Sequence, residues 1–264
     1  MYMKMITRGI LYLAALSLLT ACSYDEMIEK YEPKQESLFA KQILVDLKAK
    51  NIAEVKKHLS KDIPADNIDA QLNTVAEIFP AKEPVEIKTI GVSTNNNVSS
   101  GIWSADLTYQ YRYDPGWLLA TVSLERKGEG DLVVSGVHVK RMERSLEEIN
   151  AFTLQGKSVI HYIYLVLAIV IPLLVLYSLV LCFKTPMVKR KWLWVIFILL
   201  GFVTFKINWT TGATYFVPVS FQLFGASVFS ASPYAPWVLG ISIPVGAIVF
   251  LLKRWRMKPE IAES

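Results

Sequence analysis

The sequence predicts an α+β protein in which N-terminal helices pack on a curved antiparallel sheet of about four strands, followed by a three-helix transmembrane region. Two observations support this fold class. Apolar residues recur at three- and four-residue steps before Pro84 and at every second residue after it, which indicates helices followed by strands. The stretch Val159–Phe183 contains no charged side chain other than His161 and is long enough to cross a bilayer.

The net charge of +5 is unevenly distributed. Residues 23–157 contain 17 Lys and Arg against 21 Asp and Glu, whereas residues 158–264 contain 9 basic residues against two acidic ones. Because the soluble part is mildly acidic, we expect no nucleic acid partner. The only two cysteines are Cys22 and Cys182, so we expect no disulfide framework.

The first 22 residues have the three parts of a leader. Lys4 and Arg8 form a basic segment, residues 10–18 are apolar, and the sequence LTAC follows at 19–22. This end resembles the lipobox of bacterial lipoprotein signal peptides. The resemblance implies a signal peptide over residues 1–21 and a thioether-linked diacylglycerol on Cys22. The alternative is a secretory leader, or an uncleaved anchor, that contains this cysteine without modification.

The chain between the leader and the first apolar span is expected to have three parts. Residues 22–36 are charged and contain Pro33, so we predict a tether there. Residues 37–144 form the soluble α+β domain. Residues 145–157 form a linker helix that connects this domain to the membrane region.

Two helical segments open the soluble domain. Apolar positions over residues 39–59 follow helical steps, with a break near Lys50-Asn51. A second helix is predicted over residues 68–79 and ends at Pro80, because the residue before a proline is disfavoured in helical conformation.

After Pro84 the pattern becomes that of a meander. Polar residues from Ser104 to Arg112 alternate with apolar ones from Trp103 to Tyr113, which is typical of a half-buried strand. The turn signals Asp114-Pro115-Gly116 and Gly128-Glu129-Gly130 separate it from later segments. The predicted strands are 85–92, 103–113, 117–127 and 131–142, with a polar loop over 93–101.

This order of two helices and then an antiparallel sheet, with NIAEVKKHL at the first helix break, resembles the NTF2-like or cystatin-like α+β class. The resemblance covers about residues 37–144 and depends on topology. It implies a cone-shaped pocket between helices and sheet. Such folds contain binding modules, dimerisation modules and some enzymes, so the fold class alone does not assign a function.

The acid–base candidates do not form a recognisable catalytic or metal-binding motif. We therefore predict no catalytic residues, no metal site and no cofactor. His138, in the last predicted strand, is the strongest single catalytic candidate, although a lone histidine in a strand is more often a surface or core residue. The other candidates are His58, Asp62, Asp66, Asp69 and Asp106.

A group of aromatic residues forms the candidate pocket or partner face. Aromatic side chains on neighbouring strands either line a ligand pocket or stabilise the sheet by cross-strand pairing. Both interpretations remain open from the sequence. The candidate residues are Trp103, Tyr109, Tyr111, Trp117 and His138.

The membrane region is predicted over residues 158–258, with spans at about 159–183, 192–209 and 234–252 and a cytoplasmic tail over 259–264. Basic clusters follow the first and third spans. Cytoplasmic loops carry an excess of Lys and Arg, so we expect both clusters in the cytoplasm and residues 22–157 in the periplasm of a bacterial inner membrane.

The connection over residues 210–233 lacks charged residues but is rich in aromatic ones. We predict an interfacial or re-entrant loop that docks another membrane protein or lipid, because aromatic residues favour headgroup depth. The alternative is an apolar loop resting on its own helices. Its aromatic residues are Tyr215, Phe216, Phe221, Phe224 and Phe229.

Together these patterns favour a non-enzymatic inner-membrane lipoprotein that acts as an accessory or scaffold subunit of an envelope complex and has a membrane-protein partner. The first alternative is a periplasmic sensor or carrier that binds a small apolar molecule in the cone-shaped pocket. The second is an envelope enzyme that uses His138, which would require this histidine to be buried beside a carboxylate.

Overall fold

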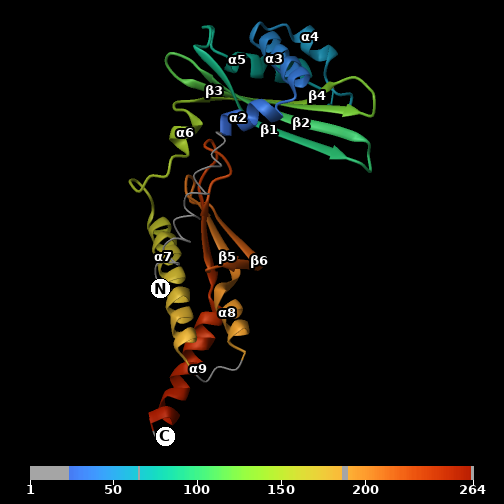
Figure 1. The fold of residues 1–264 in the computed structure, drawn as a ribbon. Coiled ribbons are helices and arrows are strands. Elements are labelled where there is room, and N and C mark those ends of the chain that lie inside the picture. The colour runs from blue at the N-terminus through green and yellow to red at the C-terminus, as the bar shows by residue number, and fades with distance from the viewer. Residues whose placement is uncertain (1–23, 65, 186–189, 263–264) are drawn as a thin grey trace. The chain divides into compact units, whose positions relative to one another are not determined.

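The structure is a computed structural model that describes residues 24–64, 66–185 and 190–262. The predicted signal peptide and Cys22 lie outside the described residues. The chain divides into two compact units, Met1–Ser145 (unit 1) and Leu146–Ser264 (unit 2). Each unit contains helices and one four-stranded antiparallel sheet, so the α+β class is confirmed (Figure 1).

Unit 1 begins with helices. Its helices are α2 (Tyr24–Tyr31), α3 (Lys34–Lys48), α4 (Ile52–Lys57) and α5 (Ile68–Ile78). The predicted break near Lys50-Asn51 is confirmed, because α3 ends before it and α4 begins after it. The predicted tether is wrong where the structure describes it: α2 buries Ile28, and the Asp25 carboxylate lies 2.9 Å from the Lys88 ammonium of the sheet.

The sheet of unit 1 (sheet A) is a simple meander. Its strands are β1 (Glu86–Asn97), β2 (Ile102–Arg112), β3 (Trp117–Lys127) and β4 (Val133–Met142), in the order β1-β2-β3-β4. The four predicted strands are therefore present. β1 runs five residues beyond the predicted end at Val92, because its polar residues pair with β2 up to Asn97 opposite Ile102.

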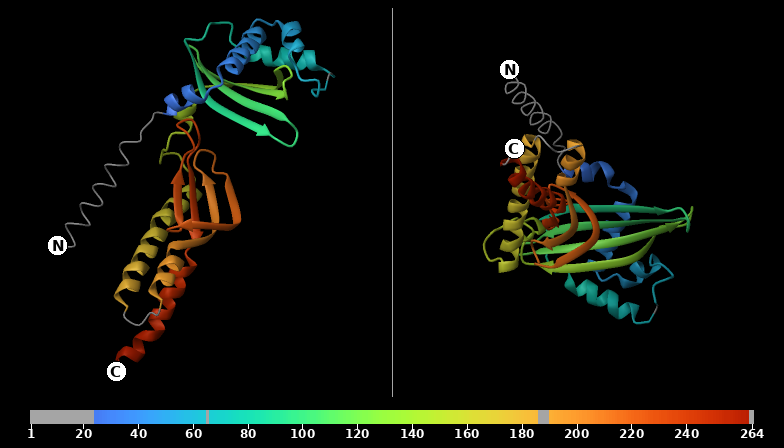
Figure 2. Two further views of the ribbon diagram at one scale, coloured as in Figure 1. Left: turned by 45° about the vertical axis from the view of Figure 1, so that its right-hand side comes forward. Right: turned by 90° about the horizontal axis from the view of Figure 1, so that it is seen from below.

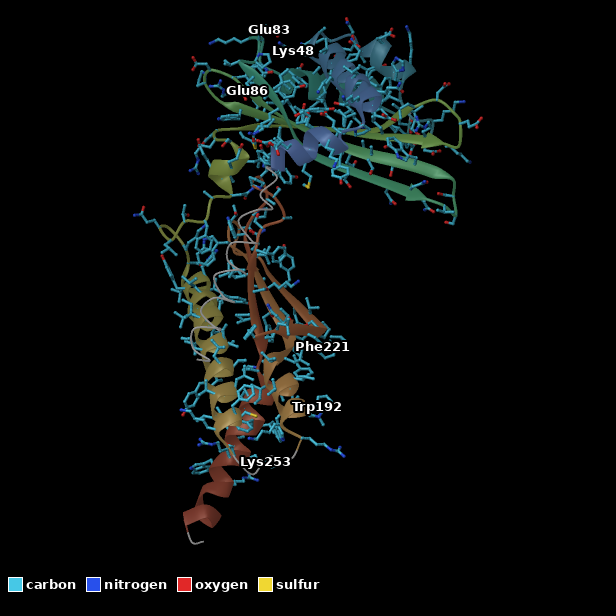
Figure 3. The ribbon with its side chains drawn as sticks, in the orientation of Figure 1. Lys48, Glu83, Glu86, Trp192, Phe221 and Lys253 are labelled. Atoms are coloured by element: carbon cyan, nitrogen blue, oxygen red, sulfur yellow. The ribbon has the colours of Figure 1, made fainter. Side chains whose placement is uncertain are left out.

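Helices α3–α5 lie on one face of sheet A (Figure 2). Side chains from both layers form one core, in which Leu47, Leu107 and Tyr109 are completely buried. An ion pair joins α3 to the segment before β1, with Lys48 Nζ at 2.7 Å from the Glu83 carboxylate (Figure 3). The apolar residues that recur with helical spacing and those that alternate along the strands thus face each other across this core.

Unit 2 combines one long helix with a second sheet. Its helices are α6 (Leu146–Ile149), α7 (Val159–Lys184), α8 (Lys191–Leu199) and α9 (Val245–Ala262). Its strands are β5 (Leu200–Asn208), β6 (Thr214–Leu223), β7 (Ala226–Phe229) and β8 (Val238–Ile243), which form sheet B in the order β6-β5-β8-β7. The predicted linker helix over 145–157 is reduced to the four residues of α6.

The prediction of three transmembrane helices is wrong. Among the described residues only α7 is long and apolar enough to cross a membrane. Residues 192–209 pass from α8 into β5, and residues 234–252 pass from β8 into α9. In an uninterrupted apolar run, periodicity does not distinguish a buried strand from a helix, which is why the sequence pattern indicated helices.

The long helix α7 contacts two separate apolar clusters. Toward its N-terminal end, Tyr164 packs with Ile207 and Trp209 at the end of β5 and with Leu239 and Ile241 of β8. Toward its C-terminal end, Val175 and Cys182 pack with Ile198 of α8 and with Ala247 and Phe250 of α9. Sheet B therefore packs on the N-terminal half of α7, and the pair α8–α9 packs on its C-terminal half.

Candidate functional site

The aromatic residues predicted to line a pocket do not lie together. Tyr109 is 0% exposed, and with Tyr111 it fills the space between sheet A and its helices. Trp103 and Trp117 are half-buried at opposite ends of the sheet, while His138 is exposed. The structure therefore does not gather these residues around one pocket. Tyr109 and Tyr111 lie opposite Ala120 and Leu118 in the register and pack in the core of unit 1.

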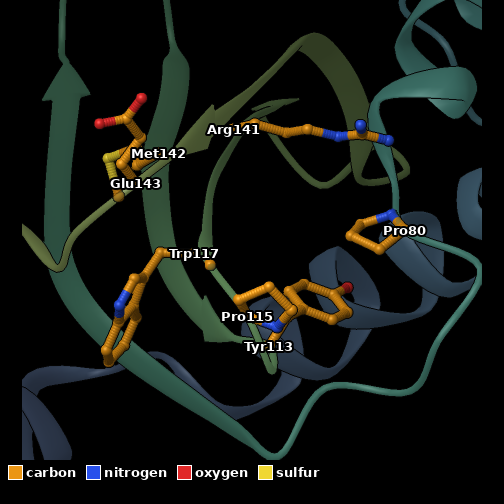
Figure 4. A pocket seen from close by; sticks show the side chains of 8 residues that line it. Pro80, Tyr113, Pro115, Trp117, Arg141, Met142 and Glu143 are labelled. Atoms are coloured by element: carbon orange, nitrogen blue, oxygen red, sulfur yellow. The ribbon is translucent and has the colours of Figure 1, made fainter.

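A cleft instead occurs at one end of sheet A, with a volume of about 560 Å³. We call it the Tyr113 cleft. In Figure 4 the ring of Tyr113 lies beside Pro115 with its hydroxyl toward Pro80, Arg141 extends toward the same proline, and Trp117 stands on the opposite side. The lining residues are Pro80, Tyr113, Pro115, Gly116, Trp117, Arg141, Met142 and Glu143.

Three segments distant in sequence form this cleft. The turn between β2 and β3 brings Pro115 and Gly116 to the cleft, and Gly116 has φ of +102°, a conformation that favours glycine. Trp117 pairs with Met142 in the sheet register, which places the end of β4 across from the turn. Pro80 closes the cleft from the chain that leaves α5.

Arg141 is held against the end of α5. Its Nε donates to the carbonyl of Ile78 at 2.5 Å, and its Nη2 donates to the carbonyl of Glu77 at 3.2 Å. These carbonyls belong to the last turn of the helix, where they lack partners within the helix. A guanidinium has five N–H donors, so Arg141 has donors left for a ligand in the cleft.

The Tyr113 hydroxyl is the unusual group of the cleft. The residue is 5% exposed, and its hydroxyl oxygen has no hydrogen-bond partner in the described part of the chain. Burial raises the pKa of Tyr113, the Glu83 carboxylate raises it further, and the Arg141 guanidinium opposes both effects. The phenol therefore stays neutral at pH 7 and can donate or accept one hydrogen bond.

The cleft combines a few polar groups with apolar walls. Its polar groups are a neutral phenol, a guanidinium and the exposed carboxylate of Glu143, between aromatic and proline side chains. No activated nucleophile lies among these residues. Nowhere among the described residues do three or more His, Cys, Asp or Glu gather in a way that could hold a metal ion.

The other acid–base candidates have structural roles. His58 packs edge-on against Phe39 with ring centroids 5.2 Å apart, and Asp69 pairs with Lys56 at 2.9 Å. Asp106 accepts a hydrogen bond from Ser123 on the neighbouring strand. Asp62 and Asp66 are exposed. None of these candidates lines the Tyr113 cleft.

The predicted aromatic loop over 210–233 is mostly strand. It contains β6 and β7, and all five predicted docking residues are exposed: Tyr215, Phe216, Phe221, Phe224 and Phe229. Because β6 is an edge strand of sheet B, its apolar side chains lie exposed along a row of unpaired backbone groups.

Comparison with protein-family models, with curated proteins and with solved structures finds no match for this chain.

Proposed function

We propose that this chain is a membrane-anchored, non-enzymatic accessory or scaffold protein of a bacterial envelope complex, with residues 22–157 in the periplasm. The observation that carries the proposal is the surface of unit 2. Large apolar side chains are exposed along α7, α8 and β6, including Trp192 and Phe221 (Figure 3). Contiguous apolar surfaces of this extent are typical of membrane or protein contacts.

The length of α7 supports a single complete crossing. Its 26 residues extend about 39 Å at 1.5 Å per residue, which exceeds the roughly 30 Å hydrocarbon core of a bilayer. Lys157 precedes the helix and Lys184 ends it. Both flanking charges would then reach the headgroup layers on opposite sides.

The basic residues support an orientation. Arg254 of α9 donates from Nε to the Thr185 hydroxyl at 3.2 Å, and Lys191 of α8 donates to the carbonyl of Phe183 at 3.4 Å. The basic ends of three helices thus gather at the C-terminal end of α7. By the positive-inside rule, this end would be cytoplasmic and the start of α7 periplasmic.

The open edge of β6 favours a protein partner. In hydrocarbon, unpaired backbone N–H and C=O groups cannot be satisfied by lipid, so this edge needs water, headgroups or another protein against it. Pro218 lacks an N–H and sits where the β5–β6 register is interrupted. We therefore expect a partner to dock through side chains such as Phe216 and Val219 rather than by adding a strand.

Site-specific photo-cross-linking in cells tests the proposal. A benzophenone amino acid at Val219, which is 84% exposed, should give one protein adduct of discrete mass. The same probe at Leu173 on α7 should react with lipid only, and at Val98 in unit 1, which is 89% exposed, it should give no such adduct. Equal patterns at all three positions, or no protein adduct at Val219, would contradict the scaffold proposal.

Lipid attachment is tested separately. Labelled fatty acid should be incorporated into the wild-type chain and not into the Cys22→Ser variant. Both proteins should remain in the membrane fraction, because α7 anchors the chain independently of acylation. Loss of the variant from membranes would show that the acyl chains, and not α7, hold the protein there.

A ligand-binding function is the second candidate, now located at the Tyr113 cleft. The buried hydroxyl without a partner favours it, because a ligand acceptor or donor there would replace a hydrogen bond that the fold leaves unmade. The cone-shaped interior is filled by side chains and offers no support for the sensor or carrier. The enzyme alternative required a buried His138, and this histidine is exposed.

A further inference from the structure

Sheet B has two faces of different character. Ile207, Leu239 and Ile241 point toward α7 and pack with Tyr164. Because side chains alternate along a strand, Thr204 and Lys206 of β5 point to the opposite face. That face carries hydroxyl and amide side chains beside apolar ones such as Val217, which lies opposite Thr204 in the register.

Hydroxyl and amide groups on this face form a connected network. The Thr204 hydroxyl lies 2.7 Å from the Ser220 hydroxyl and 2.8 Å from the Ser242 hydroxyl. Ser242 donates in turn to the side-chain carbonyl of Gln222. The Gln222 amide nitrogen is 3.5 Å from the carbonyl of Gly240, which leaves its second N–H available to another acceptor.

A groove of about 560 Å³ opens over this network. Gly240 helps to form it, because a Cβ there would lie 2.8 Å from the Ser227 hydroxyl and 3.3 Å from the Gln222 amide nitrogen. We call it the Lys206 groove. Its polar lining consists of Thr204, Lys206, Ser220, Gln222 and Ser227, and the apolar side chains of Phe221 and Leu223 also line it.

Lys206 provides a positive charge that nothing nearby neutralises. It is half-buried, and it makes no hydrogen bond or ion pair with any residue that the structure describes. The sequence contains no Asp or Glu between Glu148 and Glu260. A charged side chain at membrane depth is costly unless it is paired or reaches water, and such residues commonly mark functional sites.

We propose that the Lys206 groove binds the phosphate headgroup of an anionic phospholipid. The Lys206 ammonium pairs with the phosphate, and the Gln222 amide and the Ser227 hydroxyl donate to its oxygens. The acyl chains lie along Phe221 and Leu223. A free phosphate ion has no acyl chains and would not contact these apolar side chains. The inference rests on the proposed membrane location of unit 2.

Native mass spectrometry of the full-length protein in mild detergent tests this site. The protein is titrated with phosphatidylglycerol or with phosphatidylcholine of identical acyl chains. We expect one phosphatidylglycerol to bind at least tenfold more tightly than phosphatidylcholine. Lys206→Gln should reduce this preference to less than threefold, and Gln222→Leu should weaken phosphatidylglycerol binding several-fold.

Lys184→Gln is the matched control, because Lys184 is an exposed lysine of the same unit outside the groove. It should keep the preference of the wild type. Equal losses in Lys184→Gln and Lys206→Gln would overturn the site in favour of general surface attraction. Thermal unfolding followed by tryptophan fluorescence identifies any variant that fails to fold, and the Gln222→Leu variant then provides the independent test.

Two further experiments distinguish an error in the lipid site from an error in the proposed membrane location. If inorganic phosphate binds as tightly as phosphatidylglycerol, the acyl chains contribute nothing and the assignment to a lipid is wrong. Alkaline carbonate extraction of cell membranes tests the membrane location alone. A protein that resists extraction but shows no headgroup preference overturns only the lipid site, whereas a released protein overturns the proposed function.

Discussion

Tyr109 in β2 and Tyr113 just after it are both buried tyrosines. Replacing each by phenylalanine compares the loss of a hydrogen-bonded hydroxyl with the loss of a hydroxyl that has no partner. The Tyr109 hydroxyl lies 3.0 Å from the Ser37 hydroxyl and donates to the Ser37 carbonyl at 3.3 Å. The Tyr113 hydroxyl has no partner among the described residues. Phenylalanine keeps the ring of each residue and removes only the oxygen.

Of the two substitutions, only Tyr109→Phe should lower the stability of unit 1. A typical intramolecular hydrogen bond contributes about 0.5–1.5 kcal/mol net, so Tyr109→Phe should lower the free energy of unfolding by about 1 kcal/mol. The loss stays near this value because Ser37 keeps a second partner in Glu32. Removing the unpaired Tyr113 hydroxyl abolishes a desolvation cost, so Tyr113→Phe should leave stability unchanged or raise it by up to about 1 kcal/mol.

Urea unfolding of residues 24–145 measures both effects. This range contains the whole core of unit 1, and Trp103 and Trp117 are its only tryptophans, so their fluorescence reports on this unit alone. The control is Tyr31→Phe, because Tyr31 is well exposed. Unchanged m-values would show that the substitutions act on stability and not on the denatured state.

Two results would refute the reasoning. One is a loss of more than about 1 kcal/mol in Tyr113→Phe, since a hydroxyl without a partner cannot contribute that much. The other is an effect of Tyr109→Phe no larger than that of Tyr31→Phe. Either result would mean that the hydroxyl partners described for sheet A are not those of the folded protein in solution.

Two further predictions concern alkaline pH and helix packing. Burial raises the pKa of Tyr109 to about 12, despite its bond to Ser37, whereas an unfolded tyrosine titrates near 10. The contribution of the neutral Tyr109 to the free energy of unfolding is complete below pH 10 and is lost as the pH rises through 12. In urea unfolding of residues 24–145, the free energy of unfolding should therefore fall less over this pH range in Tyr109→Phe than in the wild type. In α9, a Cβ at Gly246 would overlap the carbonyl of Phe197 in α8. Gly246→Ala should destabilise the full-length protein by roughly 2 kcal/mol or more in a detergent melt, while Val249→Ala at an exposed position should not.

Much of unit 1 could be predicted because its elements each have one buried and one exposed face. The strand predicted from Trp117 to Lys127 is β3 with the same bounds, and α5 ends one residue before the predicted position. Alternation is visible only where polar side chains interrupt apolar ones. The helix over Tyr24–Tyr31 was missed because a short charged segment with a following proline is also typical of a tether.

The strands of unit 2 could not be predicted from periodicity. In β5, apolar residues occupy both faces near Phe202, so no alternation separates this strand from the preceding helix. One signal was present: Thr210-Thr211-Gly212, with Gly212 at φ of +75°, is a turn between β5 and β6. Reading it as a hairpin would have argued against an interfacial loop.

The Tyr113 cleft depends on contacts that no local pattern reveals. Tyr113 belonged to the predicted apolar face of its strand, but Pro80 and Arg141 are separated from it by 33 and 28 residues in the numbering. They meet because β4 pairs with β3 and because Arg141 reaches the last turn of α5. Strand register and the position of a helix over the sheet are properties of the tertiary structure. The local sequence pattern therefore predicts the strands of sheet A but not the cleft at its end.

The direct junctions between helix and strand in unit 2 limit which changes of chain length it can accept. α8 ends at Leu199 and β5 begins at Leu200, while only Pro244 separates β8 from α9. One inserted residue at either junction would turn the helix by about 100° against the strand or exchange the two faces of the strand. Insertions and deletions in homologous chains should therefore fall in the turns over residues 209–213 and 230–237, where neither helix nor strand would have to rotate.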